Sequence, residues 1–257
     1  MVPGTFFMRI CIYESKEDLG LHAAALGAEH IRQAIAARGR ASIILATGAS
    51  QFEMLNALCA ETGIDWGRVT VFHLDEYVGI SPEHPASFRN YLRQRFVAKV
   101  PPLAAFHYIQ GDASDTAAEL RRLNELIKNE DIDAAFIGIG ENGHLAFNDP
   151  PADLETGSPY IVVELDERCR QQQTGEGWFA SVNEVPRRAI SMSIPFILKS
   201  RCIICTVPDA RKANAVAMAL YGEADALHPC ATLRSHGNCY LLVDTAAAGE
   251  ILSQKLP

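Results

Sequence analysis

The sequence predicts an α/β fold with an open, mostly parallel β-sheet covered by helices on both faces. The main observation is that short apolar runs of strand length alternate with helix-like stretches from end to end. The second is that polar residues which core packing does not require follow several of these runs. The expected strands are residues 8–13, 42–46, 69–74, 134–138 and 202–207.

A long helix is expected between the first two strands. Ser15 and Asp18 are spaced like a capping box, which marks a helix start. Five residues then recur at helical spacing. They are Leu19, Ala23, Leu26, His30 and Ile31.

The length of 257 residues is enough to bury a sizeable core. No Gly/Ser-rich, Pro-rich or charge-run linker divides the chain, and no repeat is present. A single domain spanning residues 1–257 is therefore expected.

Charge and hydropathy exclude two classes of partner. The net charge of −8 argues against nucleic-acid binding, which needs clustered Lys and Arg. No apolar stretch reaches the roughly 18 residues of a membrane span, and no positive region precedes an apolar run at the N-terminus. We therefore expect a cytoplasmic location.

The seven cysteines are an odd number and are scattered through apolar segments, which favours reduced thiols over a disulfide framework. Cys202 and Cys205 form a CxxC pair, but RCIICTV has the pattern of a buried strand. We expect these two residues to be core rather than redox or zinc ligands.

In sheets of this kind the ligand lies at the carboxyl ends of the strands. The first such junction is LATGASQ, residues 45–51, followed by an amphipathic stretch. A strand, a small-residue turn and a helix start bring free backbone N–H groups and the positive end of a helix dipole together, which suits phosphate. Thr47 and Ser50 add hydroxyls. Alternatively, Ser50 or Thr47 only caps the helix.

The second junction places Asp75 and Glu76 directly after the strand at 69–74. Partial burial at the sheet edge can raise a carboxyl pKa toward that of a general base. Asp75 follows the strand immediately and is the better candidate. Alternatively, either carboxylate could cap the next turn.

The third junction is GIGENGHLAFNDP, residues 138–150. Its glycines would allow positive φ angles and a close approach to a ligand. They are Gly138, Gly140 and Gly143. His144 is followed five residues later by Asp149, and an imidazole with a neighbouring carboxylate suits acid/base chemistry.

Two other interpretations of these residues are disfavoured. A metal site of His144, Asp149 and Asp75 lacks the tight ligand spacing of zinc sites. The GxGxxG pattern resembles a dinucleotide fingerprint, but it follows a late strand, and Asp149 and Pro150 interrupt the helix that should come next.

Three segments together closely resemble the glucosamine-6-phosphate deaminase/isomerase family, which is related to the 6-phosphogluconolactonases. They are LDEYVG at 74–79, EHPASF at 83–88 and GIGENGHLAFNDP at 138–150. The resemblance implies a Rossmann-like sheet of the sugar-phosphate isomerase and lactonase type. It also implies conversion of an amino-sugar 6-phosphate to a ketose 6-phosphate plus ammonia, with no cofactor and no metal. The partner would be a small sugar phosphate, and a homo-oligomer is possible.

The resemblance also implies roles for individual residues. Asp75 would move a proton between C2 and C1, His144 would open the sugar ring, and Asp149 would orient His144. Backbone near Gly143 would line the sugar. The phosphate cradle would comprise Thr47, Gly48, Ala49, Ser50 and Lys212.

Departures from the family pattern bear on the catalytic histidine and on the sugar. Asn142 stands where some members have a carboxylate, so His144 depends more on Asp149. Asp149 itself replaces the Glu of FNEP, which shortens the carboxylate by about 1.5 Å and weakens an acid/base pair unless the loop shifts. Gln173 replaces a sugar-contacting Arg with a neutral amide.

The basic residues of the allosteric pocket of hexameric bacterial members are replaced by Pro159 and Ile161. We therefore expect no activation by an acetylated amino-sugar phosphate, and a sigmoidal rate curve made hyperbolic by that compound would contradict this.

Two alternative functions remain open. A 6-phosphogluconolactonase would share the fold and the phosphate cradle, but that family resembles DER and DGHxxSxFP where this chain has DEY and NGHLAFNDP. A non-catalytic sugar-phosphate sensor would have lost turnover through Asn142, Asp149 and Gln173.

Overall fold

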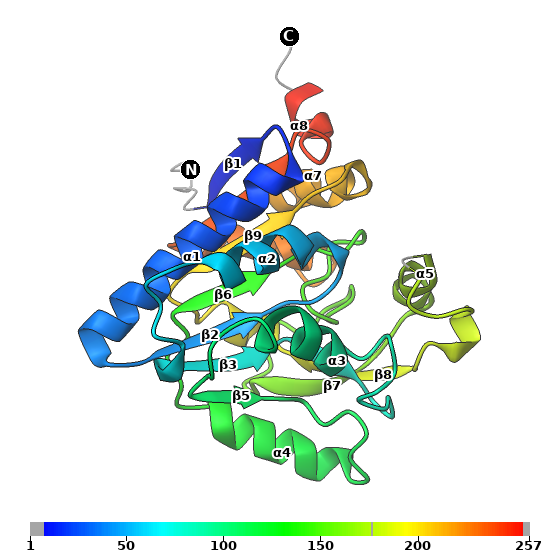
Figure 1. Ribbon diagram of the computed structural model, residues 1–257. Helices are drawn as coiled ribbons and strands as arrows, with labels where there is room; N and C mark the ends of the chain where they lie inside the picture. Colours follow the sequence, from blue (N-terminus) through cyan, green and yellow to red (C-terminus); the bar gives the residue numbers. More distant parts are fainter. Residues whose placement is uncertain (1–7, 176, 254–257) are drawn as a thin grey trace.

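The computed structural model describes residues 8–175 and 177–253 and contains a seven-stranded, fully parallel sheet (Figure 1). The strand order is β1-β10-β9-β6-β2-β3-β5. The strands are β1 (Arg9–Tyr13), β2 (Ala41–Leu45), β3 (Val69–His73), β5 (Ala105–His107), β6 (Ala134–Ile137), β9 (Ile203–Val207) and β10 (Cys239–Asp244). All five predicted strands are present, and the predicted fold class is confirmed.

A second, antiparallel sheet was not predicted. It has the order β4-β8-β7 and comprises β4 (Asp75–Tyr77), β7 (Tyr160–Glu164) and β8 (Arg188–Met192). Leu74 joins the two sheets, because its N–H donates to Leu45 O in β2 and its carbonyl accepts from Met192 N–H in β8. The small sheet is therefore fixed at the carboxyl edge of the large one.

The helices also follow the sequence pattern. They are α1 (Lys16–Arg38), α2 (Phe52–Ala60), α3 (Phe88–Leu92), α4 (Thr116–Ile127), α5 (Glu167–Gly175), α6 (Ile194–Ile197), α7 (Ala213–Tyr221) and α8 (Gly249–Ser253). The predicted first helix is confirmed: Ser15 caps α1 by accepting the N–H of Asp18 at 3.0 Å, and Gly39 ends the helix in the left-handed conformation.

Alternate residues of the central strands pack on opposite faces of the sheet, as a doubly covered sheet requires. In β2, Ile43 packs in the cluster that contains α1 and α2 residues, whereas Ile44 packs with residues of α4, α7, α8 and the small sheet. Figure 1 shows α1 and α2 on one face and α7 on the other.

The cysteines are all free thiols, and Cys202 and Cys205 are fully buried, as expected for core positions. Within the part of the chain that the structure describes, no helix combines the length and the apolar character needed to cross a membrane.

Helix α1 lies close against the sheet at Gly27. A Cβ atom added there would overlap the ring of Phe136 in β6. Gly→Ala in a helix interior normally stabilises by about 1 kcal/mol. Here we expect Gly27→Ala to lower the free energy of unfolding by about 1–3 kcal/mol, because the core would be overpacked.

Urea unfolding tests this expectation, with Gly175→Ala at the end of α5 as the control. A Cβ at Gly175 meets no heavy atom within 4 Å. The control should be neutral or stabilising, and equal behaviour of the two variants would contradict the packing argument.

Candidate active site

A cavity lies at the carboxyl ends of four adjacent strands, β9, β6, β2 and β3. Strands β2 and β6 are neighbours at the centre of the sheet. The next strand of the large sheet along the chain is β3 after β2, on one side, and β9 after β6, on the opposite side. The cavity therefore lies where the two chain connections run in opposite directions. Eight of the predicted site residues line it: Thr47, Gly48, Ala49, Ser50, Asp75, His144, Gln173 and Lys212.

The turn after β2 has an uncapped helical start. Gly48 has φ 95°, and the 3-10 turn Ala49–Gln51 leads directly into α2. Neither start is capped by a side chain, so the alternative that Ser50 or Thr47 serves as the cap is not what the structure shows. The residues of this turn line the cavity, as the phosphate interpretation requires.

A buried glutamine that was not predicted as a site residue supports this turn. Gln51 is fully buried; its amide donates to Ile137 O in β6 at 3.4 Å, and its carbonyl accepts from the Thr206 hydroxyl in β9 at 3.0 Å. It thereby links the turn after β2 to β6 and β9. No local pattern distinguishes such a residue from an exposed glutamine at a helix start.

Lys212 reaches the cavity through a strained turn after β9. Asp209 has φ 79°, which is unusual for a residue other than glycine, and its N–H donates to the Asp244 carboxylate at 3.0 Å. Lys212 closes the following 3-10 turn and is 4% exposed while lining the cavity. A cation is therefore placed opposite the turn after β2.

Asp75 and Glu76 are neighbours with different environments. Burial raises the pKa of Asp75 well above its ordinary value, and the charge of Glu76 adds to the shift. Asp75 lines the cavity. A buried carboxyl of this kind can act as a base closer to neutral pH than an exposed one can.

Glu76 points to the other face of β4 and anchors the start of α3. Its carboxylate accepts the N–H groups of Phe88 and Arg89 and the hydroxyl of Ser87, the N-cap residue, at 2.8–3.1 Å. It also accepts the N–H of Tyr77. Of the two carboxylates, Glu76 is the one that caps the next element.

The loop after β6 is shaped by its glycines, although not as predicted. Of its three glycines only Gly143 has a positive φ, of 88°, so the positive φ expected for Gly138 and Gly140 is wrong. Gly140 is needed for close approach, because a Cβ there would overlap the ring of His144. Gly140 N–H also donates to His144 O at 2.9 Å.

Gly143 faces away from the cavity. Its carbonyl accepts from Cys230 N–H at 3.0 Å, and a Cβ there would meet Met218 Sδ at 2.6 Å. It is not among the lining residues, contrary to the expectation that it lines the sugar. Its role is to let the loop turn against α7.

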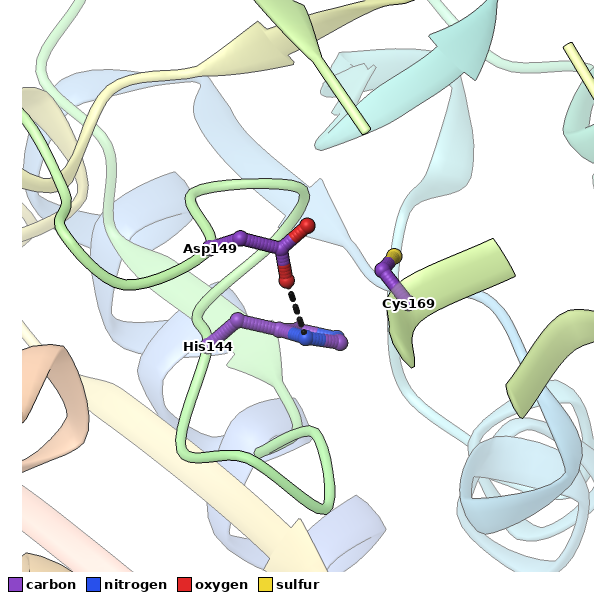
Figure 2. A group of neighbouring side chains, drawn as sticks. All are labelled: His144, Asp149 and Cys169. Atoms are coloured by element: carbon purple, nitrogen blue, oxygen red, sulfur yellow. Dashed lines mark ion pairs between the residues drawn. The ribbon is translucent and has the colours of Figure 1, made fainter. Parts of the chain in front are cut away.

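Asp149 lies behind His144 (Figure 2), with its Oδ1 3.0 Å from His144 Nδ1, although the contact does not have hydrogen-bond geometry. Asn142 connects the pair: its amide donates to Asp149 Oδ1 at 3.0 Å, and its Oδ1 accepts from His144 N–H at 3.1 Å. The aspartate therefore reaches the imidazole despite its shorter side chain. Asn142 and Asp149 act from outside the cavity lining.

The pKa of Asp149 reflects opposing effects. Burial favours the neutral acid and would raise the pKa, but His144, Asn142 and Cys169 favour the carboxylate, and the net pKa is lowered. Asp149 is therefore ionised near neutral pH and can stabilise a protonated His144.

Gln173 on α5 is held by an aromatic cluster. The hydroxyl of Tyr77 donates to Gln173 Oε1 at 2.7 Å, and the Tyr77 ring contacts Phe88 and Phe147, each with a centroid separation of 5.1 Å. Because the carbonyl oxygen is engaged, the amide NH2 is the group left for a ligand in the cavity.

One group of side chains has the composition of a metal-binding set. His144, Asp149 and Cys169 each offer a ligand atom, and these atoms lie within 4.8 Å of one another. The metal set that was considered and disfavoured from the sequence had Asp75 in place of Cys169. Cys169 was not singled out, because it lies in a different segment from the other two.

Comparison with known proteins identifies the family of this chain. The model of the family described as glucosamine-6-phosphate isomerases/6-phosphogluconolactonase matches residues 14–241. The chain belongs to this family. A glucosamine-6-phosphate deaminase of an Exiguobacterium species is 35% identical over 79% of this chain and 78% of its own. Glucosamine-6-phosphate deaminase 1 of Bacillus subtilis is 31% identical over 94% of this chain and 98% of its own.

Solved structures of the family share the fold. A monomeric glucosamine-6-phosphate deaminase has a TM-score of 0.85 at 30% identity and covers 94% of this chain and 99% of its own. A 6-phosphogluconolactonase from Shewanella baltica has a TM-score of 0.75 at 18% identity, covering 94% of this chain and 99% of its own. The second likeness is one of fold alone.

The two neighbouring carboxylates should affect stability in opposite directions. The pKa of Asp75 is raised in the folded state, so folding binds its proton more tightly, and stability is lost as pH rises above the unfolded pKa of about 4. Asp75→Asn should therefore raise the free energy of unfolding at neutral pH and have less effect in acid. Glu76→Ala should lower it by about 3 kcal/mol or more, because several donors lose their acceptor.

Urea unfolding of both variants at neutral and acid pH measures these effects. Glu76→Gln keeps one acceptor oxygen and should lie between the wild type and Glu76→Ala. Destabilisation of Asp75→Asn at neutral pH would show that its carboxylate has a structural partner.

Proposed function

We propose that this chain is a glucosamine-6-phosphate deaminase that converts an amino-sugar 6-phosphate and water to a ketose 6-phosphate and ammonia. The observation that carries the proposal is that Asp75 and His144 line one cavity together with the turn after β2 and Lys212. A base, an acid/base imidazole and an anion site thus meet within the space of one small substrate.

The phosphate is assigned to the turn at Gly48–Ser50, with Lys212 as its counter-charge. Uncapped backbone N–H groups at a helix start favour an anion, and the buried ammonium favours it further. This local arrangement is what allows an acidic protein to hold an anionic ligand. Thr47 and Ser50 supply hydroxyl groups at the same turn.

His144 is assigned to ring opening. Its Nδ1 faces Asp149, which leaves Nε2 as the nitrogen that can exchange a proton with the sugar ring oxygen and the C1 hydroxyl. The ionised Asp149 stabilises the imidazolium that forms when His144 takes a proton. Asn142 positions Asp149 for this role.

Asp75 is assigned to the transfer of a proton from C2 to C1 in the open-chain amino sugar. The raised pKa suits this role, because the carboxylate must take a proton from carbon and the acid must then return it. The resulting C2 imine is hydrolysed by water, which releases ammonia. The substrate's own amine and carbonyl supply the electronics, so the scheme needs no cofactor.

Gln173 is assigned to sugar recognition. Its amide NH2 is a neutral donor where the family pattern has a guanidinium. It would donate a hydrogen bond to a sugar hydroxyl group without adding a positive charge to the site. This difference bears on which amino-sugar phosphate fits best.

We also propose a cytoplasmic location for this enzyme, because its seven free thiols fit a reducing compartment. Residues 1–257 would act as one domain, and association into a homo-oligomer stays a prediction.

Ammonia release from glucosamine 6-phosphate tests the proposal, with a panel of other phosphorylated amino sugars assayed beside it. Asp75→Asn should lower kcat by about 10²–10⁴-fold, the usual contribution of a positioned acid/base group, while sugar-phosphate binding persists. The matched control, Asp65→Asn, replaces an exposed carboxylate and should keep full activity.

The pH profile provides a second measurement. Activity needs Asp75 ionised, and its pKa is raised, so the acid limb should fall at a higher pH than an ordinary aspartate would give. Full activity of Asp75→Asn would remove its assigned role. Saturable binding without product would identify a sensor, and hydrolysis of 6-phosphogluconolactone without ammonia release would identify a lactonase.

A further inference from the structure

A thiol stands beside the acid/base pair. Figure 2 shows His144 and Asp149 on the loop after β6, with Cys169 on α5 extending toward them. Their ligand atoms lie within 4.8 Å of one another. We call these three residues the thiol cluster. The reaction proposed above does not use Cys169.

The cluster contains buried polar atoms that lack hydrogen bonds. The side chains of His144 and Asp149 are 10% and 7% exposed. Within residues 8–175 and 177–253, neither His144 Nδ1 nor Asp149 Oδ2 has a hydrogen-bond partner. Such atoms are rare in folded proteins and commonly mark the place of a missing water or ion. Here two of them lie next to the same thiol.

The Cys169 thiol lies beside Asp149. Its contact with the aspartate favours the charged form of Asp149, and it leaves His144 Nδ1 without a hydrogen-bond partner among the described residues. Burial and the charge of Asp149 raise the pKa of Cys169, so without a cation the sulfur remains a neutral thiol. A divalent cation would favour the thiolate and would engage the imidazole nitrogen and the carboxylate together.

We propose that the thiol cluster binds a thiophilic divalent cation of the zinc type, with His144 Nδ1, Asp149 and Cys169 Sγ as ligands. Nitrogen, carboxylate oxygen and sulfur are the ligands of zinc. With bond lengths of about 2.0–2.3 Å, a tetrahedral ion holds its ligand atoms roughly 3–4 Å apart. The ligand atoms of the thiol cluster are up to 4.8 Å apart, so the side chains must move on the order of 1 Å to bind the ion.

The charges and partners of the cluster fit a cation. Asp149 supplies one negative charge, and the thiolate would supply a second after its proton passes to the buffer. Asn142 holds Asp149 by a hydrogen bond to Oδ1. Three protein ligands leave a fourth position for water. Mg²⁺ and Ca²⁺ prefer oxygen ligands and should bind much more weakly.

The bound cation would act as an inhibitor, not as a cofactor. It would occupy Nδ1 and the carboxylate that supports it, so His144 could no longer cycle between its charged and neutral forms. It would also tie α5, which carries Gln173, to the loop after β6. This consequence rests on the proposed deaminase function, whereas the binding itself does not.

Cadmium titration of the full chain tests the site directly, because a cadmium–thiolate bond gives an ultraviolet charge-transfer band. We expect a saturable band at one equivalent in the wild type and in the control variant Cys59→Ser. In the wild type the half-buried thiol of Cys59 donates to Arg95 O in another part of the fold. The band should be absent in Cys169→Ser. A band that persists in Cys169→Ser, or that is lost in Cys59→Ser, would overturn the proposal.

Zinc affinity by calorimetry extends the test to the other ligands. Cys169→Ser and Asp149→Asn should each weaken zinc binding by at least about tenfold, since loss of even an outer partner costs a metal site this much. Thermal unfolding checks that each variant is folded. Cys169→Ala replaces Cys169→Ser if the serine variant does not fold. Equal zinc affinity in the wild type and both folded variants would refute the site.

Inhibition is measured against the metal-free activity of each protein. Zinc should inhibit the wild type and Cys59→Ser at concentrations that leave Cys169→Ser active, and Mg²⁺ should not inhibit at the same concentrations. Uniform inhibition of all three proteins would overturn the inhibitory role. If no substrate is turned over, the cadmium band still decides the site, so the two proposals fail separately.

Discussion

The site depends on the parallel alignment of four neighbouring strands. Because β9, β6, β2 and β3 run in the same direction side by side, the segments that follow them meet at one edge of the sheet. Lys212, His144, the turn at Gly48–Ser50 and Asp75 come there from four separate parts of the chain. Gln51 links the turn after β2 to the ends of β6 and β9 through two buried hydrogen bonds, and a buried hydrogen bond is costly to lose.

Two adjacent carboxylates in β4, Asp75 and Glu76, lie on opposite faces of the strand and have different surroundings. Successive side chains of a strand point to opposite faces, so Asp75 faces the cavity, while Glu76 faces the start of α3. Glu76 receives enough hydrogen bonds to be an anchor. Burial raises the pKa of both carboxyls, but the hydrogen bonds to Glu76 oppose the shift, whereas among the described residues Asp75 has no hydrogen bond that lowers its pKa. Stability and reactivity are thus divided between adjacent carboxylates, and neither could take the other's place without moving the backbone.

The sequence was sufficient for the central strands, the first helix and eight residues of the cavity, because these follow from local periodicity and from the rule that ligands lie at strand ends. It was not sufficient where long-range packing decides. The strand at Asp75–Tyr77 is short and carboxylate-rich, and forms only because β8 pairs with it. Gln51 is buried by distant strands. Gly143 was assigned to the sugar from its motif, whereas α7 sets the face to which it points.

The departures from the family pattern concentrate around one imidazole, and they are physically connected. The family motif has a longer Glu where this chain has Asp149, and the shorter side chain still reaches His144 Nδ1 because Asn142 holds its Oδ1. Its second oxygen is left buried without a hydrogen bond. Cys169 on α5 lies beside the pair. The shorter carboxylate therefore still contacts His144. Together with Cys169, the two residues form the set of ligand atoms that we propose for a thiophilic divalent cation. A cation bound by these side chains would thereby tie α5 to the loop after β6, in addition to the position that Gln173 of α5 has in the cavity lining.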